Sequence, residues 1–233
     1  MNISIILPCY NESKNLLNIL NSIILIKQKY FKINLNFILV ENGSSDNSKD
    51  ILERFNKENP NKILVVYLDK NLGYGEGIMK GVLHSKTDII CWTHADLQFD
   101  LQDVIEIIIN NYKDLIKNKI IIKGKRYGRN LLDNFFTNMM SYIASIFYLK
   151  KYISDINAQP KIFHNQLLSS LINYPKDFLI DLFLIKKALE NDYIVIENVI
   201  KMNDRIHGES KGGGSFSGKL KLSFKTLSFI FRN

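Results

Sequence analysis

Three polar side chains with metal-binding chemistry alternate after a short apolar run that ends at Trp92. They are His94, Asp96 and Gln98. In extended backbone, side chains at alternate positions point to the same side. A carboxylate, an imidazole and an amide oxygen could form an open site for Mg²⁺ or Mn²⁺, and such an ion can neutralise a diphosphate leaving group. The spacing supports equally well a turn capped by Asp96 with a satisfied polar His94.

A second polar group, Glu41–Asp46, follows another apolar run. Gly43 permits a tight turn, and Asp46 can cap the next helix. The carboxylate of Glu41 and the amide of Asn42 could bind a nucleobase or a ribose. Taken alone, the segment is better explained by its turn chemistry.

Glycines gather at residues 71–77, and Lys80 and Gly81 follow them. Glycine at a helix start lets the backbone approach a phosphate. The spacing is neither the dinucleotide fingerprint nor a P-loop, so this pattern is weak evidence by itself.

Basic residues gather in two places late in the chain, at 123–129 and at 205–211. The first group contains Lys123, Lys125, Arg126 and Arg129. Runs of charge are usually solvated faces. Arginine is, however, well suited to gripping phosphate oxygens through paired donors.

The elements that must position these groups follow from apolar periodicity. Short apolar runs predict strands at 3–8, 36–41, 63–68, 88–93, 119–123 and 193–199. Amphipathic spacing predicts helices at 13–27 with Ser13 as cap, from 46 or 48, and at 74–84, 101–116, 134–152, 177–190 and 219–232. This alternation predicts an α/β fold with a mostly parallel sheet. Ligands of such sheets bind beyond the carboxyl ends of the strands, where the polar groups above are expected.

Composition excludes a disordered or fibrous chain, because 46% of the 233 residues are hydrophobic and 23% are charged. The net charge of +8 favours anionic partners.

Cys9 and Cys91 are expected to be buried core residues in a reducing compartment. No signal peptide or spanning segment is recognised, so a cytoplasmic location is expected, peripheral at the inner face of the cytoplasmic membrane. No nucleic-acid-binding motif stands out.

Six segments in order resemble the motifs of family 2 glycosyltransferases with the GT-A fold, and within them the dolichol- and polyprenyl-phosphate sugar synthases and bacterial envelope-polysaccharide transferases. The segments are Pro8-Cys9-Tyr10-Asn11-Glu12, Glu41-Asn42-Gly43-Ser44-Ser45-Asp46, the stretch 71–81, His94-Ala95-Asp96-Leu97-Gln98, Gly124-Lys125-Arg126 and Arg205-Ile206-His207-Gly208-Glu209-Ser210-Lys211. The resemblance implies a catalytic domain at 1–218, followed by an amphipathic basic tail helix at 219–233.

The resemblance also implies roles for individual residues. Those expected to hold the nucleotide-sugar donor, UDP- or GDP-linked, are Pro8, Tyr10, Glu12, Glu41, Asn42 and Lys80. His94, Asp96 and Gln98 would hold Mg²⁺ or Mn²⁺, and Arg126 would grip an acceptor phosphate. Arg205, Ser210 and Lys211 would close over the donor diphosphate and the acceptor.

Two departures from the family pattern matter. His94 replaces the first acid of the metal motif, which lowers metal affinity or moves the preference toward Mn²⁺. Glu41-Asn42 replaces an acid pair, so the nucleobase preference does not carry over. The Gln-x-x-Arg-Trp signature of processive polysaccharide synthases is absent, which indicates one transfer per encounter.

The implied reaction is a one-step inverting displacement at the anomeric carbon, with a polyprenyl-phosphate or other lipid-linked acceptor. A phosphate acceptor needs no general base, whereas a sugar hydroxyl does. Asp155 and Asp181 are the candidate bases, and a surface or capping role is the alternative for Asp181. A nucleotidyltransferase and an inactive nucleotide-binding module stay open as alternative functions.

Two aromatic, amphipathic segments, residues 135–148 and 220–231, could lie in a membrane interface with lysines outward. In the alternative, both stripes pack on the sheet or form a dimer contact. The basic stripe beside the aromatic one favours the interface for the tail.

Overall fold

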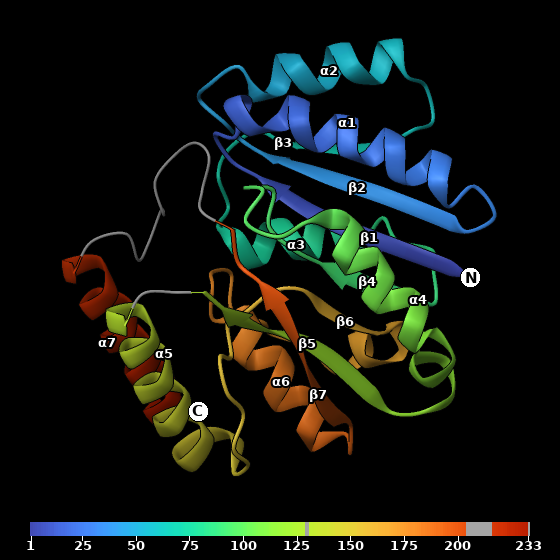
Figure 1. The fold of residues 1–233 in the computed structure, drawn as a ribbon. Coiled ribbons are helices and arrows are strands. Elements are labelled where there is room, and N and C mark those ends of the chain that lie inside the picture. Colours follow the sequence, from blue (N-terminus) through green and yellow to red (C-terminus); the bar gives the residue numbers. More distant parts are fainter. Residues whose placement is uncertain (129–130, 204–215, 233) are drawn as a thin grey trace.

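The computed structural model describes residues 1–128, 131–203 and 216–232. A sheet of seven strands in the order β3-β2-β1-β4-β6-β5-β7 forms its centre (Figure 1). The strands are β1 Asn2–Cys9, β2 Asn34–Asn42, β3 Leu64–Leu68, β4 Ile89–Trp92, β5 Ile120–Tyr127, β6 Lys161–His164 and β7 Ile194–Lys201. The pairs β1–β2, β1–β4, β2–β3 and β5–β7 are parallel, so the predicted mostly parallel sheet is confirmed.

Helices follow most of the strands. They are α1 Ser13–Lys29, α2 Ser48–Glu58, α3 Tyr74–Val82, α4 Leu101–Lys117, α5 Leu131–Ala144, α6 Ile180–Glu190 and α7 Phe216–Arg232, with a π-helical turn η1 Ser145–Leu149 and a 3₁₀ segment η2 Asn165–Ser170. The N-cap of α1 is Glu12 and not the predicted Ser13. The amide of Ser13 instead donates to Asp46 Oδ2 at 3.1 Å, because the two loops lie against each other.

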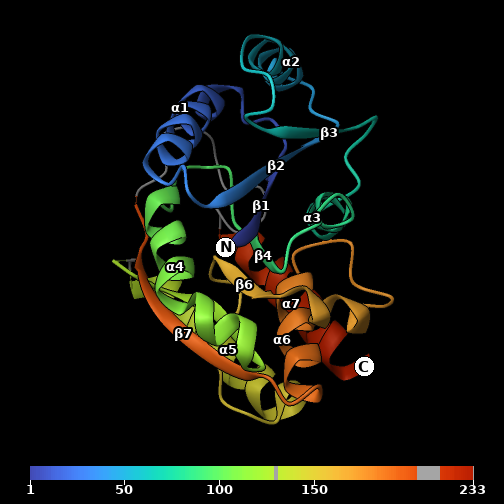
Figure 2. The same cartoon turned by 90° about the vertical axis from the view of Figure 1, so that its right-hand side faces the viewer.

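Helices cover both faces of the sheet, as Figure 2 shows from the side, and an apolar layer packs on each face. One layer packs residues of α1, α2 and α4 against alternate strand residues such as Ile5 and Leu7. The other layer packs α3, α6 and η2 against the intervening ones, such as Ile6. The two faces of each strand are therefore both buried, as the continuous apolar runs predict. Cys9 and Cys91 are buried free thiols within this core.

Strand β6 was not predicted from the sequence. It pairs antiparallel with both β4 and β5, and it separates the parallel part of the sheet from the β5–β7 pair. The strand is four residues long and follows Pro160. It contains two apolar residues, Ile162 and Phe163. Its pairing partners lie far away in the chain, so local periodicity gives little sign of it.

A third layer lies outside the sheet and its helices. It consists of α5, which continues into η1, and of α7, which lies beside α5 (Figure 1). Ile230 of α7 is buried against residues of η1 and α6, so part of the predicted tail helix packs on the protein. None of the helices within the described ranges has the length and apolarity needed to cross a bilayer.

Candidate active site

Two loops meet where β1 and β2 end. Asn11 has a left-handed φ of 55°, and its amide donates to Ser44 Oγ at 3.0 Å. The amide of Glu12 donates to Ser48 Oγ at 3.0 Å, and the Glu12 carboxylate accepts from Asn15 Nδ2 at 2.7 Å. Pro8, Tyr10 and Glu12 therefore stand at the carboxyl edge beside the start of α2, where the sequence predicts the nucleoside.

Glu41 and Asn42 are both buried at the end of β2. Glu41 Oε1 accepts from the amide of Ser44 at 2.7 Å. Asn42 accepts from the amide of Leu72 and donates to the carbonyl of Gly73, each at 3.0 Å. Glu41 therefore closes the turn after β2, and Asn42 ties the end of β2 to the loop after β3. The first contact is the turn chemistry that the sequence favours for the segment taken alone.

Lys80 does not lie with the residues at the start of α3. It pairs with Glu76 on the same helix at 3.6 Å between Nζ and Oε1. At about 1.5 Å of rise per residue it lies roughly 9 Å farther along the axis than Tyr74. Among the described residues, Lys80 pairs with Glu76 and not with the polar cluster around His94 and Asp96. The sequence predicts Lys80 as one of the donor-binding residues.

His94 and Asp96 leave the end of β4 side by side. The His94 ring lies 5.4 Å from that of Tyr74 and 6.5 Å from that of Phe99, measured between centroids. Asp96 is buried, and its Oδ1 accepts from the amide of Gln98 at 3.2 Å. The turn-capping interpretation of Asp96 is therefore correct.

Several charges converge on His94. Burial lowers the pKa of its imidazole, Asp96 and Asp181 raise that pKa, and Arg126 and Lys161 lower it. Burial first, then Asp181 and Asp96, raise the pKa of Tyr74 well above its usual value. Residues from four separate segments of the chain thus act on one ring. The balance favours neutral imidazole, which is the form that binds metals.

Asp181 is a buried residue at the start of α6, so the surface role considered for it is wrong. Its Oδ1 accepts from the indole of Trp92 at 3.0 Å and lies 3.6 Å from Lys161 Nζ. Its Oδ2 accepts from Gln159 Nε2 at 2.9 Å, and the same nitrogen donates to the Tyr74 hydroxyl at 3.0 Å. Asp181 is therefore fixed by Trp92, Gln159 and Lys161.

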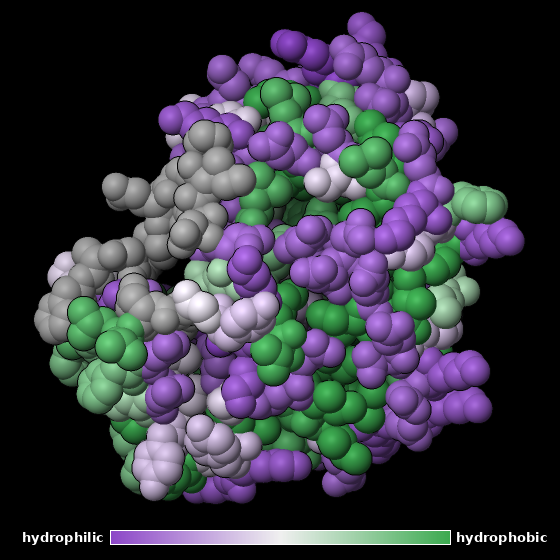
Figure 3. All heavy atoms as spheres, viewed as in Figure 1, coloured by the Kyte–Doolittle hydropathy of each residue, from purple (hydrophilic) through white to green (hydrophobic). Residues whose placement is uncertain are grey.

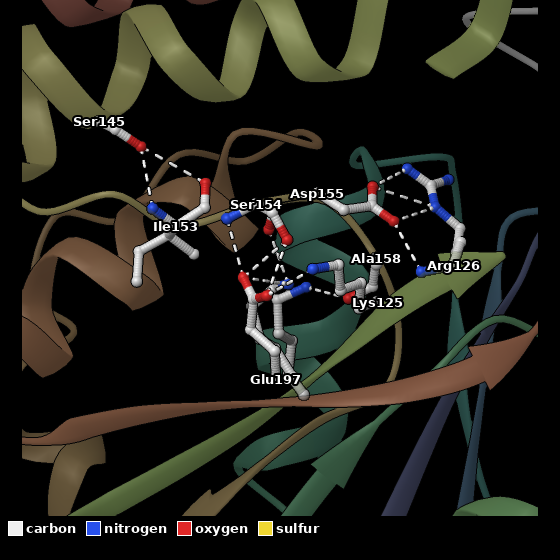
Figure 4. Close-up of polar contacts among 10 residues, drawn as sticks. Lys125, Arg126, Ser145, Ile153, Ser154, Asp155, Ala158 and Glu197 are labelled. Carbon is white, nitrogen blue, oxygen red and sulfur yellow. Dashed lines mark hydrogen bonds and ion pairs between the residues drawn. The ribbon is translucent and has the colours of Figure 1, made fainter. Parts of the chain in front are cut away.

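Arg126 and Asp155 form a closed pair (Figure 4). The Arg126 amide donates to Asp155 Oδ2 at 2.9 Å, and its guanidinium donates to both carboxylate oxygens through Nε and Nη2. Burial raises the pKa of Asp155, but the hydrogen bonds and charge of Arg126 outweigh it and lower the pKa below its usual value. This carboxylate is consequently ionised at neutral pH.

Two fully buried lysines, Lys123 and Lys161, face each other across the β5–β6 pair. Lys123 Nζ donates to the Ser154 carbonyl at 2.7 Å and lies 3.5 Å from Glu197 Oε1 (Figure 4). Burial and the charge of Lys161 lower the pKa of Lys123 to about 8. Lys161, Gln159 and Trp92 were not predicted as site residues from the sequence. The one feature that could have indicated a role for Lys161 is its position between Pro160 and a pair of apolar residues.

The predicted donor-closing residues Arg205, Ser210 and Lys211 lie outside the described residues. The last described residue before them, Asn203, donates from its amide to the Gln98 carbonyl at 2.9 Å. The chain therefore leaves β7 toward residue 204 next to the predicted metal motif.

The residues present suit a divalent ion that is shared with a ligand. Across the ranges 1–128, 131–203 and 216–232, no three His, Cys, Asp or Glu side chains gather into a metal site. A buried carboxylate from Asp96 and a neutral imidazole from His94 supply part of a coordination shell, which phosphate oxygens can complete. Mg²⁺ is commonly bound in this way, through one or two carboxylates and substrate phosphates.

Among proteins of related sequence, the chain is similar to Uncharacterized protein MJ0544 of Methanocaldococcus jannaschii, at 21% identity over 97% of this chain and 98% of that one. It is also similar to the undecaprenyl-phosphate 4-deoxy-4-formamido-L-arabinose transferase of Edwardsiella ictaluri, at 24% identity over 91% of this chain. The alignment spans only 63% of that transferase's length.

Among solved structures, the fold is similar to mannosyl-3-phosphoglycerate synthase from Rubrobacter xylanophilus, with a TM-score of 0.76 at 11% identity over 100% of this chain and 73% of that one. It is also similar to glucosyl-3-phosphoglycerate synthase from Mycobacterium tuberculosis, solved with Mn²⁺, UDP and glucosyl-3-phosphoglycerate, with a TM-score of 0.71 at 14% identity over 98% and 79%. The predicted GT-A fold is confirmed by these likenesses. The family model for glycosyl transferase family 2 matches residues 4–174, more than half of the sequence, and the protein belongs to that family.

Proposed function

We propose that this glycosyltransferase moves a sugar from a UDP- or GDP-linked donor to a polyprenyl phosphate or another lipid-linked acceptor, in cell-envelope glycan synthesis. The observation that carries the proposal is a pair of ion pairs at the carboxyl edge of the sheet, Lys161 with Asp181 at 3.6 Å and Arg126 with Asp155. Buried cations beside carboxylates at the carboxyl edge of the sheet suit a ligand with several phosphate charges. The polyprenyl-phosphate transferase among the relatives supports the choice of acceptor.

Asp96 and His94, with Gln98 beside them, would hold Mg²⁺ or Mn²⁺ against the donor diphosphate. When bound, the ion supplies charge compensation for the departing nucleoside diphosphate. The neighbours solved with Mn²⁺ support this cofactor class. Pro8, Tyr10, Glu12 and Glu41 line the edge that would receive the nucleoside, and Asn42 keeps the adjoining loops in place.

Arg126 would orient the acceptor phosphate. Its contacts with Asp155 use the amide, Nε and Nη2. A guanidinium has five N–H donors, so Nη1 can still donate to a phosphate oxygen. Because Asp155 fixes the guanidinium plane, the phosphate meets donors that are already oriented. A phosphate oxygen is already an anion, and its attack on the anomeric carbon in one inverting step needs no base.

A saccharide hydroxyl is the second candidate acceptor, and Asp181 is then the stronger candidate base. The lowered pKa of Asp155 and the engagement of both of its oxygens with Arg126 make it a weak base. Asp181 Oδ2 accepts one hydrogen bond, from Gln159, and can accept another from a hydroxyl. In this proposal Asp155 positions Arg126 and does not take a proton.

The proposed acceptor places the protein at the inner face of the cytoplasmic membrane as a peripheral protein. The division into a catalytic domain at 1–218 and a tail at 219–233 belongs to the same proposal. Arg205, Ser210 and Lys211 would close the site over the donor diphosphate.

The test is a transfer screen with UDP- and GDP-sugars, in Mg²⁺ or Mn²⁺, against polyprenyl phosphate and against saccharide acceptors. One nucleotide-sugar should support single additions to polyprenyl phosphate, and Asp96→Ala should abolish turnover in a folded protein. Wild-type turnover in Asp96→Ala would remove that residue from the mechanism. Transfer to saccharides alone would favour the hydroxyl acceptor. Calorimetry that detects no nucleotide binding with either metal would contradict the proposed function and leave a role other than an enzyme.

A further inference from the structure

The outer layer of α5, η1 and α7 carries a face of exposed apolar side chains. Leu131 is 86% exposed and Phe224 is 69% exposed. We call the following residues the outer apolar face: Leu131, Leu132, Phe135, Met139, Tyr142, Ile146, Phe147, Leu220, Phe224 and Phe231. On α5 and η1 the members from Leu131 to Ile146 recur at three- and four-residue intervals, which places them along one side of the helix.

The two helices present this face together. Lys219 near the start of α7 pairs with Asp133 near the start of α5. At the other end, the rings of Phe147 in η1 and Phe231 in α7 lie 5.5 Å apart between centroids, although both side chains are more than half exposed. The helices therefore run side by side in one direction, and their exposed aromatics join. Figure 3 shows apolar side chains gathered over α5 at the edge of the molecule.

The charge of this layer is mainly positive. Residues 131–152 and 216–232 carry six basic residues and a single acidic one, Asp133, which Lys219 already pairs. They hold five of the eight net positive charges of the chain. A hollow of about 370 Å³ beside η1 is lined by Tyr142, Ser145, Ile146, Lys150, Lys151 and Tyr152. Apolar, aromatic and basic groups thus occur in the combination that suits the headgroup region of an anionic bilayer.

The layer is also joined to the candidate site. The chain leaves Arg126 at the end of β5, forms α5 and η1, and returns at Asp155, which binds Arg126. Ser145 of η1 accepts from the amide of Ile153 at 3.0 Å on the way back. The Arg126–Asp155 pair therefore joins the two ends of the segment that contains α5 and η1. The outer layer is thus connected, through the chain and through this ion pair, to the residue proposed to orient the acceptor phosphate.

We infer that α5, η1 and α7 form a docking surface for an anionic lipid bilayer, with the outer apolar face in the headgroup region and Lys150 and Lys151 on lipid phosphates. A second copy of the chain is the competing occupant. The excess of like charge argues against it, because a self-complementary contact would bring the lysines of the two copies together. The inference rests on the proposed function in one respect, because a lipid-linked acceptor explains why the protein would bind a membrane. Binding to lipid itself can be measured without any sugar transfer.

The experiment is flotation of the full chain with vesicles of phosphatidylcholine alone or of phosphatidylcholine mixed with phosphatidylglycerol. Wild type should float with the anionic vesicles, and added salt should release it. Lys150→Ala and Lys151→Ala should each lower the partition coefficient about fivefold. Phe135→Ala with Phe224→Ala should lower it by about tenfold or more. All four side chains are exposed, so these variants should fold.

Matched controls come from exposed residues on other elements. Phe31→Ala removes an equally exposed aromatic between α1 and β2, and Lys113→Ala with Lys117→Ala removes two exposed lysines of α4. Both controls should float like wild type. Equal binding to neutral and anionic vesicles, or unchanged binding of the three variants, overturns the inference. A wild-type dimer that Phe135→Ala and Phe224→Ala dissociate, with no flotation, assigns the face to a second copy instead. If vesicles bind but no sugar is transferred, only the proposed function fails.

Discussion

Arg126 and Asp155 lie 29 residues apart in the chain, and the arginine donates to both oxygens of the carboxylate from its amide and its guanidinium. The pair ties the end of β5 to the segment that returns from η1. It is largely buried, with side-chain exposures of 16% and 9%. A contact of this kind fixes both the guanidinium and the base of the outer helical layer.

Asp155→Asn should destabilise the protein and impair acceptor use together. Removing one partner of a buried ion pair costs about 3 kcal/mol, because the remaining charge stays buried without compensation. Urea unfolding should show this loss, and kinetics should show a raised KM for the acceptor with donor binding unchanged. Asp50→Asn, an exposed residue of α2, is the control and should change neither quantity. Unaltered acceptor kinetics in a folded Asp155→Asn protein would remove Asp155 from the positioning of Arg126.

The same pair predicts an acid-dependent loss of stability. The folded pKa of Asp155 is below its usual value near 3.8. Its contribution is therefore present above that value, and it is lost as the pH falls through the folded pKa. The difference in unfolding free energy between wild type and Asp155→Asn should be full at about pH 7 and should shrink below about pH 4. A difference that stays constant across this range contradicts an ionised Asp155 in the folded protein.

Asp181 and Lys161 should show strong energetic coupling. Asp181→Asn leaves Lys161 buried with its Nζ on the Ala158 carbonyl and without its carboxylate partner. Each single substitution, Asp181→Asn or Lys161→Met, should cost about 3 kcal/mol. The double variant should cost less than the sum of the two by about 1 kcal/mol or more, measured by a double-mutant cycle in urea. Additive losses would show that the 3.6 Å approach contributes no net interaction.

The parallel core of the fold was predictable because each of its strands is a continuous apolar run bounded by polar loops. The runs Ile3–Leu7 and Phe37–Val40 are examples, and both lie in the sheet core. The antiparallel β6 was not predictable, since its register with β4 and β5 is fixed by long-range pairing and not by its own four residues. The order of strands in the sheet likewise depends on contacts that periodicity does not contain.

The candidate site likewise contains residues that could be predicted from the sequence and residues that could not. His94, Asp96 and Arg126 were recognisable because they follow strands in short polar segments. The residues that surround them were not recognisable. From the sequence alone, Trp92 is indistinguishable from a core aromatic residue and Lys161 from an ordinary surface lysine. Their roles arise when β6 brings Lys161 beside β5, and when α6 brings Asp181 under β4. Lys80 stays a predicted donor-binding residue, and the structure pairs it with Glu76 on the same helix.

Gly124→Ala should strongly destabilise the folded protein. A Cβ on Gly124 would lie 1.9 Å from the Gln159 carbonyl oxygen and 2.6 Å from its carbon, both backbone atoms that cannot rotate away. The expected loss is about 3 kcal/mol or more. Gly81→Ala is the comparison, because its nearest atoms are methyl groups of Ile6 and Val40. It should lose less in thermal unfolding, and an equal loss in the two variants would contradict the backbone clash.

Lys123 should make the protein more stable as the pH rises above neutrality. Burial and the charge of Lys161 bring its folded pKa to about 8 from an ordinary value of 10.5. Between these values the unfolded chain holds a proton that the folded chain has released, so the free energy of unfolding increases with pH. The increment from this group is on the order of 2 kcal/mol between about pH 7.5 and about pH 10. Lys123→Met should remove it.

Urea unfolding at several pH values measures this slope. Lys161 is also buried with a lowered pKa, so part of the slope should persist in Lys123→Met. Lys125→Met is the matched control, because Lys125 contacts the same Glu197 at 3.4 Å but is 48% exposed. Its slope should equal that of wild type. If Lys123→Met keeps the full wild-type slope, the buried lysine is not titrating in this range, and the cation beside Glu197 is held charged throughout.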